Sequence, residues 1–375
     1  MKNKINISEL NYLTKIANNQ SSMILGDAVL LSKIPSPTFQ THRKAAILLE
    51  KFSLLNLDEL KIDNFGNVIS ILSCNKKLPK ILVSSNMDTA YDQDVDLNTY
   101  IETDKIVGPS IGLNSLGLAS LFSLAYILKK NNLFEHGDII FACTAGSQGS
   151  GASAGMRGLM MKYQNTIDYV ICLDGIQLGK VANQSLFRNN INIIITTDGV
   201  CNSNKLPDTI FKNNNAVYYS TLILNKIFDI DLNMRKEKYI TIEKITSEKG
   251  NADYANKVKI KLRIEADKLE PVENICSSID FFAKLISKNN PCKIYLQNNS
   301  LTPGGIIGNK EPIIKIISEI HSILNIDTHY VSQVSDVSIP ISMNIPAITI
   351  GIANGGNKRL LNEYIMPASI KTGFL

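Results

Sequence analysis

The chain has 375 residues, which at about 150 residues per domain indicates two or three domains rather than one small module. Hydrophobic residues make up 44% of the sequence and charged residues 19%, a globular mixture that excludes a disordered chain. The net charge is +5, but Lys and Arg form no basic run, so the composition does not favour a nucleic-acid or anionic-membrane partner.

The sequence predicts neither a secretion signal nor a membrane helix. The N-terminal segment, residues 1–20, lacks the continuous apolar core of a signal peptide, and no apolar stretch is expected to reach the roughly 18 residues of a membrane helix. The six cysteines are scattered and form no CxxC pair. We therefore expect a cytoplasmic protein with reduced cysteines and no membrane partner.

The first half of the chain alternates helices with apolar strands. Residues 20–55 predict two helices separated by the break at Pro35 and Pro37. Further elements follow in order, namely strands at 67–72 and 80–85, a helix at 115–130, a strand at 138–144, a Gly/Ser-rich turn at 146–155, a helix to Tyr163 and a strand at 168–174. This alternation predicts an α/β fold with a mixed, mostly parallel sheet that is flanked by helices on both faces.

The middle of the chain has a different pattern. It predicts a strand at 190–197, a helix at 215–228, strands at 239–246 and 257–267, a helix at 271–288 and a strand at 292–297. This βαββαβ order is typical of a ferredoxin-like domain. The first pattern then resumes with a helix near 310–324, a turn at Ser335–Asp336, a strand at 345–351 and a final helix from about Leu361. We therefore predict an α/β domain formed by residues 1–187 and 305–375, with a domain of residues 188–304 inserted into it.

Several loops at the predicted carboxyl ends of the strands carry a resemblance to a known family. The matching segments lie in the family's order over nearly the whole chain, at 30–38, 63–70, 81–89, 108–121, 144–158, 173–175, 335–351 and 355–365. The chain thus resembles the di-zinc aminoacylase/carboxypeptidase family, which includes acetylornithine deacetylase, succinyl-diaminopimelate desuccinylase and the tripeptidase-T relatives. The resemblance implies a zinc-exopeptidase fold whose inserted domain acts as a lid and as the surface of a homodimer.

The resemblance also implies a specific active site. The family holds two Zn²⁺ ions with His and carboxylate ligands and uses a Glu as general base. Matched onto this sequence, the metal-ligand positions carry Asn86, Leu113, Gln148, Asp174 and Arg359, and the general-base position carries Ser147. Only Asp174 is a ligand of the family's type. Asp88, whose family role is to orient the first His, is also present. We therefore expect no metal cofactor, because neutral side chains and a guanidinium bind Zn²⁺ poorly.

The remaining charged residues allow two interpretations. Asp88 and Asp174 are expected to be hydrogen-bonded or ion-paired carboxylates. Arg359 is either a solvated turn residue beside Lys358 or a guanidinium that fills the former metal space and pairs with Asp174 or Asp88. In the inserted domain, the family's substrate-contacting positions fall on Asn202 and Asn256.

Two functional hypotheses follow. The first is a non-catalytic homologue of the hydrolases, which binds a peptide or an acylated amino acid or serves in assembly. The second is an amidohydrolase with a reconfigured single-metal or metal-free site that uses Asp88, Asp174, Ser147 and Arg359. Ser147 has a very weakly basic hydroxyl and no His in these loops to activate it, so the sequence favours the first hypothesis.

Overall fold

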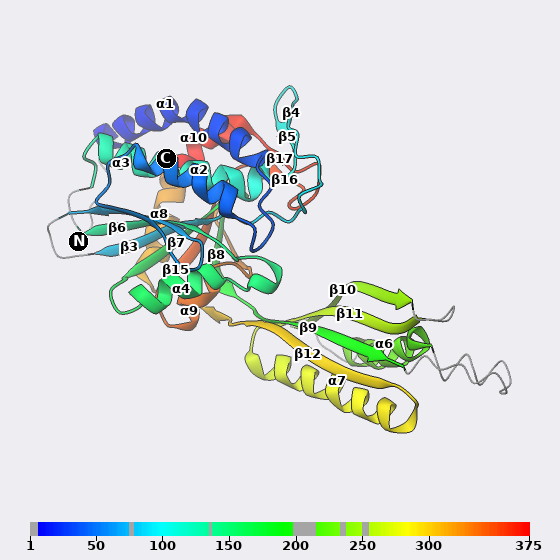
Figure 1. Cartoon of the computed structure of the whole chain (residues 1–375). Helices are drawn as coiled ribbons and strands as arrows, with labels where there is room; N and C mark the ends of the chain where they lie inside the picture. Colours follow the sequence, from blue (N-terminus) through cyan, green and yellow to red (C-terminus); the bar gives the residue numbers. More distant parts are fainter. Residues whose placement is uncertain (1–6, 75–78, 135–136, 198–214, 233–237, 250–254) are drawn as a thin grey trace. The chain divides into compact units, whose positions relative to one another are not determined.

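The computed structural model describes residues 7–74, 79–134, 137–197, 215–232, 238–249 and 255–375. The chain forms two compact units, unit 1 of Met1–Ser185 with Ile306–Leu375 and unit 2 of Leu186–Gly305. It therefore leaves unit 1 once and later returns to it. Figure 1 shows both units with their helices and strands labelled.

Unit 1 is built around one mixed sheet with the strand order β1-β2-β6-β3-β7-β15-β8-β13, in which β14 also pairs with β8. The central strands β6, β3, β7 and β15 run parallel, whereas β2 and β8 are antiparallel to the central strands beside them. The strands span Glu59–Ile62 (β1), Val68–Ser73 (β2), Lys80–Asn86 (β3), Asp138–Thr144 (β6), Tyr169–Ile176 (β7), Lys180–Ser185 (β8), Gly305–Ile306 (β13), His329–Ser332 (β14) and Ala347–Ala353 (β15).

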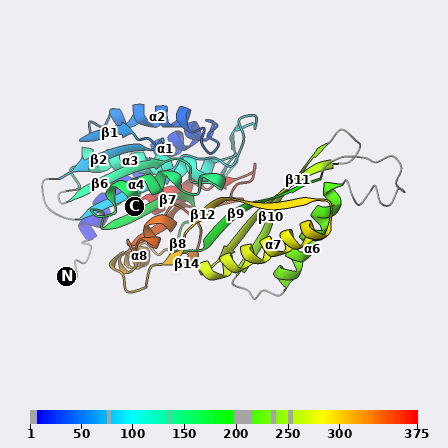
Figure 2. The ribbon, with the colours of Figure 1, turned by 60° about the horizontal axis from the view of Figure 1, so that its bottom comes forward.

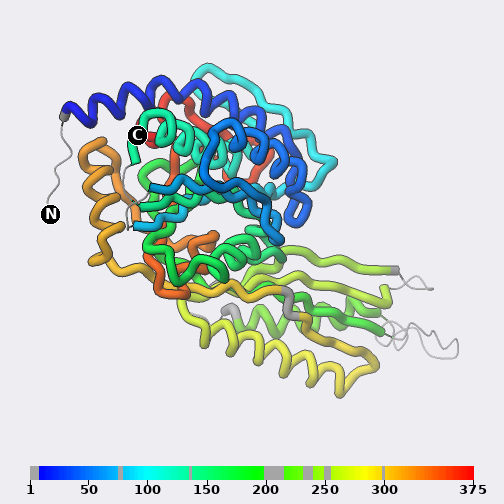
Figure 3. Tube along the Cα trace, turned by 60° about the vertical axis from the view of Figure 1, so that its left-hand side comes forward, coloured from blue at the N-terminus to red at the C-terminus, as the bar shows by residue number. Residues whose placement is uncertain are grey.

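The central strands are mainly apolar, as expected for a sheet that helices cover on both faces. One face carries α1 (Ile7–Ser32), α2 (His42–Ser53), α3 (Gly117–Lys130) and the short α10 (Ile370–Phe374). The other carries α4 (Ala154–Tyr163), α8 (Pro312–Ile323) and α9 (Ser338–Ser342). In Figure 1 the first layer lies above the sheet, with α4 and α9 below it. Figure 3 shows α1, in dark blue, along the outside of its layer. The predicted α/β fold with a mostly parallel sheet is confirmed.

A small second sheet of unit 1 corrects one prediction. It has the order β16-β17-β5-β4, formed by Gly355–Gly356, Tyr364–Ile365, Ile106–Val107 and Tyr100–Ile101. The final helix expected from Leu361 is therefore wrong, because the chain turns at Leu361 and then forms β17, which pairs with β5. Pro367 opens a single 3₁₀ turn (Pro367–Ser369), and α10 begins only at Ile370.

A second correction concerns the segment Ile111–Lys130, which consists of a π-helical turn (Ile111–Leu116) and α3. It is long and apolar enough to cross a membrane, with a mean hydropathy of 1.7, so the expectation that no stretch reaches this length is wrong. However, 78% of its apolar window is buried inside the structure, which is typical of a core helix of a globular domain. The cysteines within the described residues have free thiols.

Unit 2 is an antiparallel sheet with the order β10-β11-β9-β12 and two helices. In chain order its elements are β9 (Phe187–Thr196), α6 (Ala216–Leu232), β10 (Lys238–Lys249), β11 (Ala255–Ala266), α7 (Leu269–Asn289) and β12 (Lys293–Thr302). On β11, Val258, Ile260, Leu262 and Ile264 alternate with polar residues and are buried in the core with residues of both helices. Figure 2 shows α6 and α7 on one face of this sheet. The predicted βαββαβ order is confirmed.

Candidate functional site

Asp88 lies just after β3 and fastens two loops at the carboxyl end of the sheet. Its Oδ1 accepts a hydrogen bond from the Gly146 amide (2.9 Å), and its Oδ2 accepts bonds from the Gln148 amide (3.1 Å) and the Thr38 hydroxyl (3.0 Å). Gln148 Nε2 returns a bond to the backbone oxygen of Asp88 (3.0 Å). Gly146 has a φ of 66°, which an L side chain rarely adopts, so glycine suits this turn. Two of the predicted site residues, Asp88 and Gln148, are therefore in direct contact.

Asp88 is fully enclosed, and burial raises the pKa of its carboxyl from 3.8 to about 6 in spite of these hydrogen bonds. A buried lysine of α2, Lys44, lies within electrostatic reach. Burial lowers the pKa of Lys44 to about 7, and the carboxylate of Asp88 opposes that shift. Both groups are thus buried at positions where the charged form is unfavourable in free energy.

Ser147, the residue at the family's general-base position, contacts a second buried carboxylate that the sequence analysis treated only as part of a turn. Ser147 Oγ donates to Asp336 Oδ2 at 2.8 Å, and Thr144 Oγ1 donates to the same oxygen at 2.5 Å. Burial raises the pKa of Asp336, while the hydroxyls of Thr144, Ser153 and Ser147 oppose the shift. Asp336 therefore connects the loop after β6 to the start of α9. The one sequence signal for it is an Asp directly before a short apolar segment.

Asp174, near the end of β7, is paired with a cation of the chain itself. Lys358 Nζ lies 3.2 Å from Asp174 Oδ2, and Gln333 Nε2 donates to the same oxygen at 2.9 Å. Lys180 is also close, since Asp174 raises its pKa while burial and the charge of Lys358 lower it. The cation that pairs with this carboxylate is therefore Lys358, which the sequence analysis named only as the neighbour of Arg359.

The loops that carry Leu113 and Arg359 are joined by Glu363, which is completely buried. Glu363 Oε1 accepts hydrogen bonds from the amides of Gly112 and Leu113, both at 2.8 Å, and Oε2 accepts one from the Arg359 amide at 2.9 Å. Burial raises the pKa of Glu363, and the three amides oppose the shift. Leu113 and Arg359 are therefore positioned through their backbones, with Arg359 in a left-handed conformation (φ 62°).

The three remaining predicted site residues are all asparagines. Asn86 ends β3, and its Oδ1 is buried without a hydrogen-bond partner among the residues that the structure describes. Asn256 lies on β11 of unit 2, where its backbone oxygen accepts a bond from the Thr197 amide (2.9 Å). Asn202 lies outside the described residues.

The residues present do not fit a dinuclear zinc centre. Within the described parts of the chain, no group of three or more His, Cys, Asp or Glu side chains could hold a metal ion. Asp174, the single position with a suitable donor, already has an ammonium partner. The crevice beside it is about 10 Å³, room for about one water molecule. We derive no metal-dependent step from this arrangement.

Solved structures show which fold this site belongs to. The chain is similar to the aminopeptidase PepT from Bacillus cereus, with a TM-score of 0.68, 18% identity, and 94% of this chain and 96% of that chain covered. It is also similar to a tripeptidase from Staphylococcus aureus (TM-score 0.72, 19% identity, coverage 94% and 95%) and to the dipeptidase Dug1p from Saccharomyces cerevisiae (TM-score 0.76, 12% identity, coverage 97% and 96%). A dinuclear metal-binding peptidase of the M20 family, YxeP from Bacillus subtilis, matches with a TM-score of 0.67 at 11% identity. This chain has the M20 peptidase fold.

The suspected resemblance is confirmed at the level of the fold. No family model matches the sequence, and no curated protein matches it either. Within the M20 fold of unit 1, the predicted residues Asn86, Asp88, Ser147, Gln148 and Asp174 all lie at or just beyond the carboxyl ends of parallel strands β3, β6 and β7. In open α/β sheets this edge is where ligands bind.

Proposed function

We propose that this chain is a non-hydrolytic protein with the M20 peptidase fold, which binds a peptide or an N-acyl amino acid without cleaving it. The observation that carries the proposal is the ion pair between Lys358 and Asp174. An ammonium on the one remaining carboxylate of the family's ligand set supplies the positive charge that such a carboxylate needs, and it competes with any metal for the same oxygen.

The contacts around the former ligand positions support the same proposal. Gln148 is bonded to Asp88, Ser147 to Asp336, and the Leu113 and Arg359 amides to Glu363. Each of these residues thus makes at least one hydrogen bond to another part of the chain. A hydrolase would instead need an activated water and a base able to take its proton.

The charges near Asp174 favour an anionic group on the ligand. Lys180 and Lys358 both act electrostatically on Asp174, and Lys358 also lowers the pKa of the buried Glu363, so these two ammonium groups form the cationic part of the site. The carboxylate of a peptide or of an N-acyl amino acid complements it.

Calorimetry with N-acetyl-L-alanine and with its uncharged amide tests the ligand class. We expect the acid to bind and the amide to bind at least tenfold more weakly, because a charge-assisted hydrogen bond is worth about 1.5–3 kcal/mol. Lys358→Met should remove this preference, whereas Lys371→Met, an exposed lysine on α10, should retain it. Equal binding of acid and amide would contradict the ligand assignment.

The absence of hydrolysis is tested separately, by metal analysis and by dipeptide turnover of the purified protein. We expect neither stoichiometric zinc nor turnover. The combined variant Asn86→His, Leu113→Asp, Ser147→Glu, Gln148→Glu and Arg359→His should recover zinc binding, while single variants should not, because a metal site needs its whole ligand set. A folded combined variant that binds no zinc would show that the site is misplaced.

One contact favours the alternative, a reconfigured hydrolase. Ser147 Oγ donates to the buried carboxylate of Asp336, an arrangement from which a base could take the hydroxyl proton. Under this alternative the purified protein turns over dipeptides or N-acyl amino acids, and Ser147→Ala abolishes the turnover without changing the fold.

A further inference from the structure

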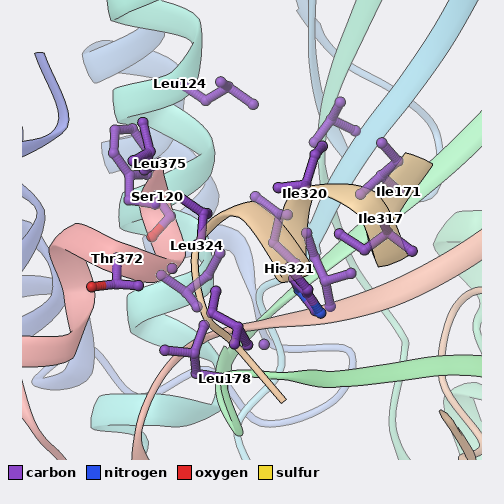
Figure 4. A pocket seen from close by; sticks show the side chains of 18 residues that line it. Ser120, Leu124, Ile171, Leu178, Ile317, Ile320, His321, Leu324, Thr372 and Leu375 are labelled. Atoms are coloured by element: carbon purple, nitrogen blue, oxygen red, sulfur yellow. The ribbon is translucent and has the colours of Figure 1, made fainter. Parts of the chain in front are cut away.

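Unit 1 has an apolar pocket that is not part of the candidate site at the carboxyl ends of β3, β6 and β7. The proposed function does not use it. Its volume is about 200 Å³, and Figure 4 shows the side chains that line it. Residues of α8 form one wall, with Ile317, Ile320, His321 and Leu324, while Ser120 and Leu124 of α3 lie on the opposite side. Ile171 and Ile350 of the central strands and the last residues of the chain complete the lining.

The lining predicts an uncharged occupant. None of the residues around this pocket is Asp, Glu, Lys or Arg. Burial lowers the pKa of His321, so its ring is neutral at physiological pH. An ionised ligand group would therefore lose its hydration without gaining a counter-charge from any side chain of the lining, which is costly.

Two polar groups of the lining could orient a ligand through hydrogen bonds. Ser120 is completely buried, and its Oγ has no hydrogen-bond partner among the described residues. His321 Nδ1 lies 2.9 Å from Thr328 Oγ1, so its described hydrogen bond engages Nδ1 and not Nε2. A buried hydroxyl without a partner costs stability, and a ligand with one hydroxyl could satisfy it.

The size of the pocket limits the ligand further. An apolar cavity of about 150 Å³ stays dry and accepts benzene, so about 200 Å³ accommodates a six-membered ring with two or three further heavy atoms, or an alkyl chain of similar volume. We propose that this pocket binds a small uncharged molecule with an apolar body and a single hydroxyl, with the hydroxyl directed to Ser120 or His321.

The experiment uses benzyl alcohol and toluene as probes, and it follows the methyl resonances of Ile and Leu by NMR. Both probes should shift the resonances of Ile317, Ile320 and Leu124, with benzyl alcohol binding more tightly. Ser120→Ala should weaken benzyl alcohol about fivefold and leave toluene unchanged, because a single hydrogen bond is lost.

A pair of neighbouring variants on α8 provides the control. Ile320→Trp fills the pocket and should abolish binding of both probes, whereas Glu319→Trp, on the exposed side of the helix, should leave binding intact. Thermal unfolding verifies that both variants fold. The proposal is overturned if the probes shift no methyl resonance around the pocket, or if they bind to Ile320→Trp as they do to the unmodified protein.

Discussion

At the scale of single residues, the pairing of Lys358 with Asp174 is the contact on which the functional proposal depends. Both side chains are largely shielded, with 23% and 11% of their surfaces exposed, so solvent screens their attraction little. Removal of one partner would leave the other charge poorly compensated, which is more damaging than removal of both.

A double-mutant cycle with Asp174→Asn and Lys358→Met should therefore give a coupling free energy of about 2 kcal/mol in urea unfolding. The same cycle on Lys105 and Glu102, whose side chains are 36% and 50% exposed, should give a clearly smaller coupling. Equal coupling for the two pairs would mean that the burial of Asp174 has no energetic consequence.

Lys44, on which the charge of Asp88 acts, makes the stability of the fold depend on pH. Its pKa is lowered from 10.5 to about 7, mainly by burial. Between these values the unfolded chain binds the proton more strongly than the folded chain does, so this residue makes stability rise with pH from about 7 to about 10.5.

Lys44→Met should flatten the stability profile over that range. It should also raise the free energy of unfolding near pH 7.5 by on the order of 3 kcal/mol, since no buried amine then has to lose or carry a proton. Unfolding in urea at several pH values measures this. Arg43→Met, an exposed neighbour, should keep the original slope, and a Lys44→Met profile with the same slope would be the contrary result.

The sequence was sufficient to predict ligand positions from the resemblance, but not to predict the contacts of those residues. Asp174 and Asp88 were identified because they fall at fixed positions in local motifs. Lys358 and Gln333 contact Asp174, and Asp336 contacts Ser147, from segments far away in the chain, and no local pattern encodes such a contact. Lys358 lies one residue before Arg359, and the left-handed φ of Arg359 illustrates why a count along a loop cannot give side-chain directions.

At the scale of elements, Glu363 joins two loops that are about 250 residues apart. Three backbone amides donate to its carboxylate, the buried one of Gly112 and the partly buried ones of Leu113 and Arg359. If the carboxylate is removed, these amides lose an acceptor that lies in the interior of the domain.

Glu363→Ala should consequently lower the free energy of unfolding by about 4 kcal/mol, which is well above the effect of an average substitution. Glu363→Gln retains one acceptor oxygen and should cost less. Chemical denaturation provides the measurement, with Glu319→Ala on the exposed face of α8 as the reference. A loss below about 1 kcal/mol for Glu363→Ala would argue against the anchoring role.

The regular elements were largely predictable, since the central strands are apolar runs and the strands of unit 2 alternate with period two. The irregular ones were not. β1, β8 and β14 are short or polar and were missed, and the supposed helix from Leu361 is instead a turn followed by β17, which pairs with β5. The tertiary contact overrides the local preference in that case.

At the scale of the whole molecule, assembly remains a prediction. On α7 of unit 2, Phe281 and Leu285 lie one helical turn apart and are 61% and 43% exposed. Apolar side chains exposed at this spacing suit a helix that packs against a second copy. A cytoplasmic location likewise stays a prediction.

Light scattering coupled to size-exclusion chromatography should find a homodimer at micromolar concentration. Phe281→Glu together with Leu285→Glu should convert it to a monomer, because two carboxylates cannot be buried in such an interface. Lys284→Gln, on the same helix, should remain dimeric. If the unmodified protein is a monomer, the prediction of dimerisation through unit 2 is wrong.

The ammonium of Lys358 has one more consequence, for how the protein responds to its surroundings. A bound metal ion can be removed by a chelator, or its site can stay empty when the metal is scarce. The ammonium of Lys358 is covalently attached to the chain and cannot dissociate. The carboxylate near the end of β7 therefore keeps its counter-charge whatever the supply of metal ions. Treatment with EDTA should accordingly leave the melting temperature where it was.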